Sequence, residues 1–467
     1  MRETAGAVWV CALAMGVVLA AGADERQITF STKNHCLDNN DNFSADGRFL
    51  CYDTREGVGP GIENCQSIEK VEIATGEETV LYTPAASVRG ERAAPGVGAA
   101  SYSPVENKVA FIHGPPLRDV PDRGYYAKPN RNGVEVLADG SGRNVWLDKR
   151  DTATARDTIP GAHRGGTHRH EYSRDGKRIG FTYDDVLLPQ YGRTVGYMER
   201  HPKAPRGATH YVALLVPVVP KGMAKPGEIE HAAGDSWVDP HGAMRAFVGK
   251  VREDDGESYE ESLFVVDVPL DVDISTADSG SATRFPSAPK GTRIRRLTHA
   301  YAGGIVRGSP EGDRIAYYGR DKDGLPQVFI IASDGSDRDP DPAKRPVQAT
   351  HLPEGAGPGL RWHPSGNVVL CISNNAVVAT CVKPGLRFGK WAFLTPHGDA
   401  PERSELVVSP DGELVAFTKP VPTLNAAGQR VYTYDGQDLR QIFVFAYPAA
   451  DASGIPDAIT RPRNPSP

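Results

Sequence analysis

The densest run of chemically versatile side chains in the sequence is 163–171, which contains two histidines one residue apart. Side chains on a β-strand alternate with a period of two, so His168 and His170 are predicted to point to the same side. Two imidazoles so placed suit Zn²⁺ or Mn²⁺ if further ligands converge from other parts of the fold. Without such ligands they would form a polar lining for a binding site, together with Arg164 and Thr167.

Other candidate residues are spread along the chain. Arg307 and Arg361 carry guanidinium groups that can hold a carboxylate through two parallel hydrogen bonds. Asn42 adds an amide, and His35 and His113 add imidazoles. If the fold gathers these side chains around one channel, we expect the channel to bind a polar or acidic ligand.

Several enzyme classes are excluded because their motifs are absent. The sequence has no Gly-x-Ser-x-Gly nucleophile elbow, no phosphate-binding Gly-x-x-x-x-Gly-Lys-Ser/Thr loop and no His-Glu-x-x-His zinc motif. The segment Gly57–Gly61 does not follow the dinucleotide-binding pattern. A formal charge of −6 argues against a nucleic-acid partner, since such binding depends on neutralising phosphates.

The elements that must position the candidate residues follow from a repeated turn. A Ser or an equivalent residue begins the turn, a Gly usually ends it, and a short apolar strand follows. Ser or Asp can hydrogen-bond the turn backbone, Pro fixes φ, and Gly tolerates a positive φ. The copies are Ser44–Gly47, Ser103–Asn107, Ser173–Gly176, Ser309–Gly312, His363–Gly366 and Ser409–Gly412, with a weaker one at Asp239–Gly242.

This repeat predicts an all-β fold, a single β-propeller. The 50 Gly and 38 Pro among 467 residues agree, because they disfavour a helical bundle, and 39 % hydrophobic residues suffice for a large core. The clear turns indicate six blades. Counting the Asp239 copy, whose second strand is predicted at Ser262–Asp267, favours seven.

We predict that the propeller spans 24–456 and that its N-terminal strand closes the ring. Gln27–Phe30 is expected to pair beside Gln441–Phe445 in the last blade, and Asp457–Thr460 is the competing partner. Pairing of this kind leaves no free sheet edge. The tail 457–467 is predicted to be disordered.

The first 23 residues are predicted to be a signal peptide. An apolar run, Ala5–Ala20, is followed by small residues at Ala21–Ala23, which suit cleavage by a signal peptidase. The competing interpretation is an uncleaved membrane anchor. No later segment has the about 20 apolar residues needed to span a bilayer. We therefore expect a periplasmic or secreted monomer.

Five cysteines remain in the chain after residue 23, so at least one is free or pairs outside the chain. No Cys-x-x-Cys motif occurs, which argues against thioredoxin-like chemistry and zinc ribbons. Cys51 and Cys371 lie in apolar runs and are predicted to be core residues. If a disulfide forms, Cys36 with Cys65 is the first pair to test.

The turns and the Leu-Thr sequences at blade ends resemble the TolB-type propellers. Over the whole mature chain the sequence more closely resembles the YidR-type family of bacterial propeller proteins, which has no established activity. The matching segments are Gln27–Phe30 with Asn34 and His35, Phe111–Pro115, Arg164–His170, Phe181–Asp185 and Trp362–Gly366. The signal peptide, the longer loops 220–236 and 270–290 and the C-terminal tail depart from the family. The resemblance implies the propeller fold and implies no reaction.

Two functions from different classes remain open. The first is an exported propeller that binds a protein, peptide or glycan at its central channel or top face without catalysis. The second is a metal-dependent lyase or hydrolase acting on carboxylated oligosaccharides, which would resemble oligogalacturonate lyase. There a metal would neutralise the uronate carboxylate, a histidine would take the α proton and arginines would orient the acid. One scaffold serves many propeller functions, which favours binding.

Overall fold

The computed structural model describes residues 24–38, 41–57, 61–398, 401–448, 450–451 and 454–460. The predicted signal peptide at 1–23 lies outside these residues, as does the part of the predicted tail at 461–467. Within the described ranges, no helix is both long enough and apolar enough to cross a membrane.

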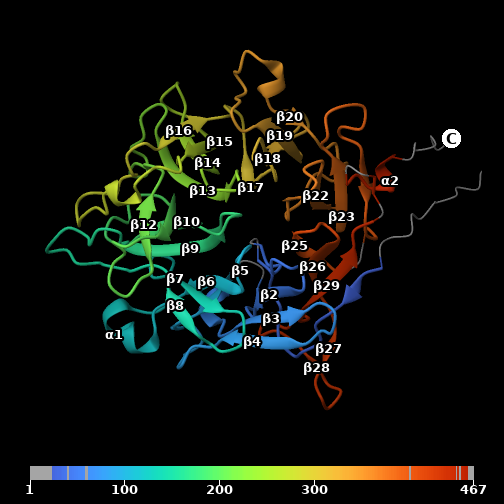
Figure 1. Cartoon of the computed structure of the whole chain (residues 1–467), viewed down its shortest axis with the longest axis horizontal. Coiled ribbons are helices and arrows are strands. Elements are labelled where there is room, and N and C mark those ends of the chain that lie inside the picture. Colours follow the sequence, from blue (N-terminus) through green and yellow to red (C-terminus); the bar gives the residue numbers. More distant parts are fainter. Residues whose placement is uncertain are drawn as a thin grey trace, which may run out of the picture.

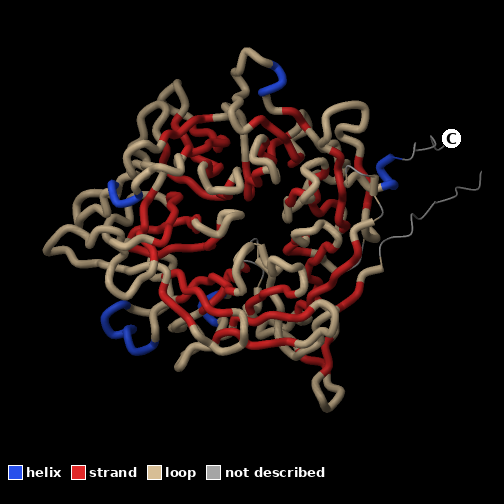
Figure 2. The backbone as a smooth tube through the Cα atoms, in the orientation of Figure 1, coloured by secondary structure: helices blue, strands red, loops and turns tan. Residues whose placement is uncertain are grey.

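Seven antiparallel sheets, the blades, stand around a central axis, and one edge strand of each sheet lies nearest that axis (Figures 1 and 2). The prediction of seven blades is confirmed, and the weak turn at Asp239 connects two strands of blade 4. Blade 1 contains β2 (Phe49–Asp53), β3 (Ile68–Glu72) and β4 (Glu78–Tyr82). Blade 2 contains β5 (Val97–Tyr102), β6 (Lys108–His113), β7 (Asn132–Leu137) and β8 (Asn144–Trp146). Blade 3 contains β9 (Gly165–Tyr172), β10 (Arg178–Asp185), β11 (Thr194–Arg200) and β12 (His210–Leu214).

The remaining blades follow in chain order, and short elements decorate their loops. Blade 4 contains β13 (Ile229–Trp237), β14 (Met244–Arg252), β15 (Tyr259–Asp267) and β16 (Arg293–Arg296), and blade 5 contains β17 (Gly303–Gly308), β18 (Arg314–Arg320), β19 (Pro326–Ala332) and β20 (Val347–Gln348). Blade 6 contains β21 (Arg361–Trp362), β22 (Val368–Ser373), β23 (Ala376–Cys381) and β24 (Trp391–Phe393). Blade 7 contains β25 (Ser404–Val408), β26 (Leu414–Pro420), β29 (Arg440–Ala446) and β1 (Arg26–Gln27). The loops carry a hairpin of β27 (Thr423–Leu424) and β28 (Arg430–Val431), the helices α1 (Val120–Arg123) and α2 (Asp457–Thr460), and the 3-10 turns η1 (Ile62–Asn64), η2 (Leu117–Asp119), η3 (Ile274–Thr276) and η4 (Pro342–Lys344).

The repeated turn is built as the sequence predicts. In blade 7, the Ser409 hydroxyl donates to the Asp411 carboxylate and accepts a 2.9 Å hydrogen bond from the Leu414 main-chain nitrogen. Gly412 has a φ of +78°, a conformation that residues with a Cβ rarely adopt. The side chain at the start of the turn therefore replaces a backbone partner and directs the chain into the second strand.

The hydrophobic core is divided among the seven interfaces between neighbouring blades. Between blades 3 and 4, for example, Tyr197 packs with Trp237 and Phe247. Each blade is thus stabilised by burying both of its faces against its neighbours. The predicted core residues Cys51 and Cys371 belong to two of these clusters.

The N-terminal strand closes the ring, as predicted. Gln27 of β1 pairs with Phe443 of β29, and the Ile28 nitrogen donates to the Ile442 carbonyl at 2.9 Å. The alternative prediction, that Asp457–Thr460 pairs into the last blade, is wrong. These residues form helix α2, whose buried Ile459 packs into the hydrophobic cluster between blades 6 and 7. The prediction of disorder is wrong for these four residues.

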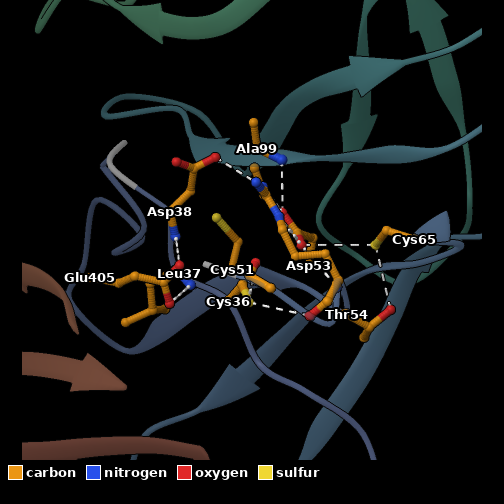
Figure 3. A network of polar contacts seen from close by, with 12 residues as sticks. Cys36, Leu37, Asp38, Cys51, Asp53, Thr54, Cys65, Ala99 and Glu405 are labelled. Atoms are coloured by element: carbon orange, nitrogen blue, oxygen red, sulfur yellow. Dashed lines mark hydrogen bonds and ion pairs between the residues drawn. The ribbon is translucent and has the colours of Figure 1, made fainter. Parts of the chain in front are cut away.

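A buried polar network stabilises the junction of blades 7, 1 and 2 (Figure 3). Asp53 of β2 pairs with Arg55 and accepts a 2.8 Å hydrogen bond from the Ala99 nitrogen of β5. Arg55 also pairs with Asp38 at 2.9 Å. On the other side, the Glu405 carboxyl accepts from the Asp38 nitrogen at 3.3 Å. These contacts join three blades through charged groups that carry almost no solvent exposure.

The proposed disulfide between Cys36 and Cys65 is absent, and all five described cysteines are free and buried. The Cys36 thiol donates to the Arg55 carbonyl at 3.4 Å, while the Cys65 thiol lies 3.8 Å from an Asp53 oxygen. Both sulfurs therefore serve as weak donors within the network of Figure 3. Burial raises the pKa of Cys65 to about 12, which keeps this thiol protonated and unreactive.

Candidate functional site

A cavity of about 390 Å³ lies on the axis at the end of the ring where the innermost strands finish. Every blade contributes to its wall, and segments from all seven blades can meet only at the axis. Representative wall residues, one from each blade in turn, are Asn42, Tyr102, Glu171, Trp237, Arg307, Arg361 and Ser409. We call this space the central cavity.

Three arginines give the central cavity a cationic wall. Arg174, Arg307 and Arg361 come from blades 3, 5 and 6. Burial, and then the charges of Arg361 and Arg169, lower the pKa of Arg307 well below its ordinary value. Like charges held together out of water repel each other, so an anionic group in the cavity would relieve this repulsion.

The Arg174 side chain lies at the mouth of the central cavity and is exposed. Its guanidinium donates to the carbonyls of Gly308, Ser309 and Pro310 in blade 5. In the described part of the chain, no carboxylate lies within ion-pair distance of it. Its positive charge is therefore positioned by neutral oxygens, and the carboxylates of Asp41 and Glu171 attract it from the cavity wall without forming an ion pair.

Glu171 holds three blades in register at the cavity wall. Its carboxylate lies 2.9 Å from Arg245 of blade 4 and 3.5 Å from Arg307 of blade 5. The Ser236 hydroxyl donates to it at 2.5 Å. Although burial opposes ionisation, the charge of Arg245 keeps the pKa of Glu171 below its usual value. We conclude that this carboxylate is ionised and already fully occupied with partners.

Two tryptophans supply the apolar part of the wall. The Trp237 indole nitrogen donates to the Glu171 carbonyl at 3.1 Å, and that of Trp362 donates to the Arg307 carbonyl at 2.9 Å. Each bond fixes a ring against the neighbouring blade. The cavity thus combines rigid aromatic surface with positive charge, the composition typical of sites that orient a ligand bearing an acidic group.

Three of the nine predicted site residues line the central cavity: Asn42, Arg307 and Arg361. The Asn42 amide donates to the carbonyls of Cys51 at 2.9 Å and Ala100 at 3.3 Å, which ties blade 1 to blade 2. The other six residues lie elsewhere in the fold, each within its own set of hydrogen bonds.

The prediction that His168 and His170 share one side is wrong. A bulge in β9 places Arg169 at a φ of +60° and shifts the register against β10. Alternation is interrupted there, so His170 bonds Thr167 at 3.1 Å while His168 faces Arg131 at 2.9 Å. Burial lowers the pKa of His170 to about 4. Within the described ranges, no group of three or more His, Cys, Asp or Glu is arranged to hold a metal.

The four remaining predicted residues have partners away from the central cavity. Arg164 is fully buried and pairs with Asp185 at 2.6 Å, and Thr167 donates to Asp148 at 2.6 Å. His35 lies against the Arg440 carbonyl of blade 7, at 3.1 Å. The fourth residue, His113, ends strand β6 and lines a surface pocket at the opposite end of the ring.

Sequence reasoning missed Glu171, Arg174, Trp237 and Trp362. A signal was available, because each lies in or just before a copy of the repeated turn. In a propeller this turn follows the innermost strand, so the residues around it must surround the axis. Their positions relative to the repeated turn therefore identify them as residues near the axis.

Comparisons relate this chain to known proteins. The family described as protein of unknown function (DUF3748) matches residues 96–203. The uncharacterised protein YidR of Escherichia coli (strain K12) is 32% identical over 432 residues, which cover 86% of this chain and 96% of YidR. Among solved structures, putative TolB from Agrobacterium tumefaciens aligns with a TM-score of 0.36 at 12% identity, over 80% of this chain and 95% of that one. The β-propeller domain of the Trilobed protease from Pyrococcus furiosus aligns with a TM-score of 0.45 at 10% identity, over 88% of this chain and 96% of that one.

Proposed function

We propose that this chain, which belongs to the family of YidR, is a binding propeller that takes an acidic segment of a peptide or glycan into its central cavity. The observation that carries the proposal is the wall itself, in which cations from blades 3, 5 and 6 adjoin tryptophans from blades 4 and 6. A guanidinium pair can hold a carboxylate, and an indole ring can pack against a sugar face or a peptide side chain.

The size of the cavity limits what it holds. Ligand pockets of about 300–1,000 Å³ enclose drug-sized molecules, and the central cavity lies at the lower end of that range. We therefore propose that it encloses one or two units of a longer ligand. The rest of that ligand would extend over the loops around the mouth, where Arg174 stands.

We propose further that the protein works in the periplasm or outside the cell, as the segment 1–23 suggests. Mass spectrometry of protein purified from the native organism tests this directly. The expected N-terminal residue of the mature chain is Asp24. A chain that retains residues 1–23 in the membrane fraction would contradict cleavage.

The central cavity is tested by ligand titration that follows intrinsic tryptophan fluorescence, to which Trp237 and Trp362 of the cavity wall contribute. Oligogalacturonate and an acidic peptide are the two probes, so the result also separates glycan from peptide. Uncharged versions of both serve as ligand controls. Binding of an acidic probe, and of neither uncharged version, is expected.

Three variants complete the experiment. Arg307→Gln and Arg174→Gln should each weaken binding roughly tenfold, because a charged hydrogen-bond donor is lost. Because Arg174 also donates to three carbonyls of blade 5, the thermal stability of its variant is measured together with binding. Arg320→Gln, at an exposed position of the same blade as Arg307, should bind as the wild type does. The proposal would be contradicted if neither acidic probe binds, or if all three variants lose the same amount of binding affinity. An unsaturated product formed from oligogalacturonate would instead identify a lyase.

A further inference from the structure

Two adjoining pockets lie on blade 2 at the end of the ring opposite the central cavity. They are formed by the loops that follow β6 and β8, and the second pocket is also lined by the loop that follows β4 of blade 1. Because β6 and β8 run antiparallel to the innermost strand, their ends lie where that strand begins. We call this end of the ring the top face. A ligand bound there would not touch the central cavity.

The first pocket, of about 200 Å³, is basic. Arg118 and Arg123 come from the loop after β6, and Lys149 and Arg150 come from the loop after β8. The Arg123 guanidinium donates to the side-chain oxygens of Asn130 at 3.0 Å and Asn132 at 2.9 Å. These side chains are therefore oriented by neutral acceptors.

Three of the four cations of this pocket have no ion pair in the described chain. Arg150 donates to the Gly165 carbonyl at 3.1 Å, and in the described chain no carboxylate lies within ion-pair distance of Arg123, Lys149 or Arg150. Burial, and then the charge of Arg123, lower the pKa of Arg150 to about 10. The pocket thus holds positive charges that repel one another, a condition that an oxyanion would relieve.

The acidic groups at this site are already occupied. Asp148 accepts from the Asn132 amide at 2.6 Å, from the Gly133 nitrogen at 3.0 Å and from the Thr167 hydroxyl at 2.6 Å. The other acid, Asp119, stands at the rim and lies 3.6 Å from Arg118. Neither is placed to pair with Arg150.

The second pocket, of about 240 Å³, is largely apolar and aromatic, and it shares Arg118 and Trp146 with the first. Its wall includes Tyr82 and His113, whose side chains bond each other at 2.9 Å. The Trp146 ring lies 5.0 Å from the His113 ring, edge to face. Burial lowers the pKa of His113 to about 4, so this imidazole is uncharged at neutral pH.

We infer that the two pockets form one site for a small molecule that joins an oxyanion to a planar apolar ring. The basic pocket would hold a phosphate or carboxylate through Arg123 and Arg150, whose fork of donors matches such groups. The aromatic pocket would hold the ring against Trp146 and Tyr82. Each pocket is smaller than the range typical of a complete drug-sized ligand, so the ligand spans both.

Calorimetric titration with four probes tests the site. Phenyl phosphate and phenylacetate carry both features and differ in the oxyanion, inorganic phosphate carries the anion alone, and benzyl alcohol carries the ring alone. At least one of the two combined probes should bind roughly tenfold more tightly than either single-feature probe. Comparison of the two shows whether the site prefers phosphate or carboxylate.

Variants then locate the binding. Arg150→Gln and Arg118→Gln should weaken the combined probe several-fold, and the Arg118 side chain is 82% exposed, so its replacement cannot unfold the protein. Trp146→Leu should reduce the advantage of the combined probe over inorganic phosphate. Arg143→Gln is the control, because this arginine lies on the same blade, is 72% exposed and pairs with Asp139.

The outcomes separate this site from the central cavity. The inference is supported if Arg150→Gln and Arg118→Gln weaken binding of the combined probe while Arg307→Gln has no effect on it. This holds whether or not the acidic oligomers bind in the central cavity. No heat from either combined probe, or equal weakening by Arg143→Gln, would overturn it. Binding of inorganic phosphate as tightly as phenyl phosphate would overturn the role of the aromatic pocket.

Discussion

The Glu405 carboxyl group accepts a hydrogen bond of 3.1 Å from the Leu37 main-chain nitrogen, although the two residues stand 368 positions apart in the chain. Glu405 lies in the innermost strand of blade 7, and Leu37 precedes blade 1. The bond therefore spans the seam where the ring closes. It is made by a carboxyl group that is almost completely removed from water.

This burial predicts a pH-dependent stability. It raises the pKa of Glu405 to about 7, against an ordinary value of 4.5. The folded state thus binds a proton more tightly than the unfolded state, and the resulting stabilisation, complete below the ordinary pKa, is lost as the pH rises through about 7. The free energy of unfolding of the wild type should fall relative to that of Glu405→Gln by up to about 3 kcal/mol between about pH 4.5 and about pH 8.

Urea denaturation at several pH values measures this difference. Glu402→Gln is the matched control, since the Glu402 side chain is 79% exposed, and its curve should run parallel to that of the wild type. If the free energy of unfolding of Glu405→Gln also changed with pH in parallel with that of the wild type, the pKa of Glu405 would be ordinary.

Closure of the ring by β1 predicts a large effect of a small N-terminal change. Ile28 is buried at 1% exposure between blades 7 and 1, so Ile28→Ala should lower the free energy of unfolding by roughly 2–5 kcal/mol. Ile159→Ala, at a position 37% exposed, should change it little. Differential scanning calorimetry gives both values. Equal stability of the two variants would mean that β1 does not close the ring.

The repeated turn predicts a cost for adding a single methyl group. A Cβ on Gly412 would lie 2.5 Å from a His363 ring nitrogen, and its φ is +78°. At Gly428 the φ is similar, +74°, but the Cβ would meet open space. Gly412→Ala should therefore destabilise the protein by at least about 1 kcal/mol more than Gly428→Ala in chemical denaturation. The reverse order would contradict the packing of this turn against blade 6.

Free thiols predict a simple chemical result. Alkylation of residues 24–467 under denaturing conditions without a reductant should modify all five cysteines of that segment, whereas the native protein should react slowly because each is buried. Mass spectrometry counts the modifications. A mass corresponding to three modifications would show that one disulfide forms and would contradict five free thiols.

Much of the fold could be predicted because local chemistry repeats. A turn that needs Ser or Asp at its start and Gly near its end is visible in any sequence, and seven copies imply seven blades. The pairing of Gln27 beside Phe443 followed from the need to cover a sheet edge. The short helix at Asp457–Thr460 was not foreseen, since Ile459 fills an apolar gap that exists only once blades 6 and 7 are together.

The candidate sites depended more on tertiary structure. The sequence by itself determined that Arg307 and Arg361 would approach the axis, because both precede a repeated turn. Only the tertiary structure decided that His168 and His170 face different partners, because one residue with a positive φ reverses the alternation of β9. It also decided that Arg123 and Arg150 line one pocket on the top face, since a concentration of cations depends on distances between loops and not on any spacing along the chain.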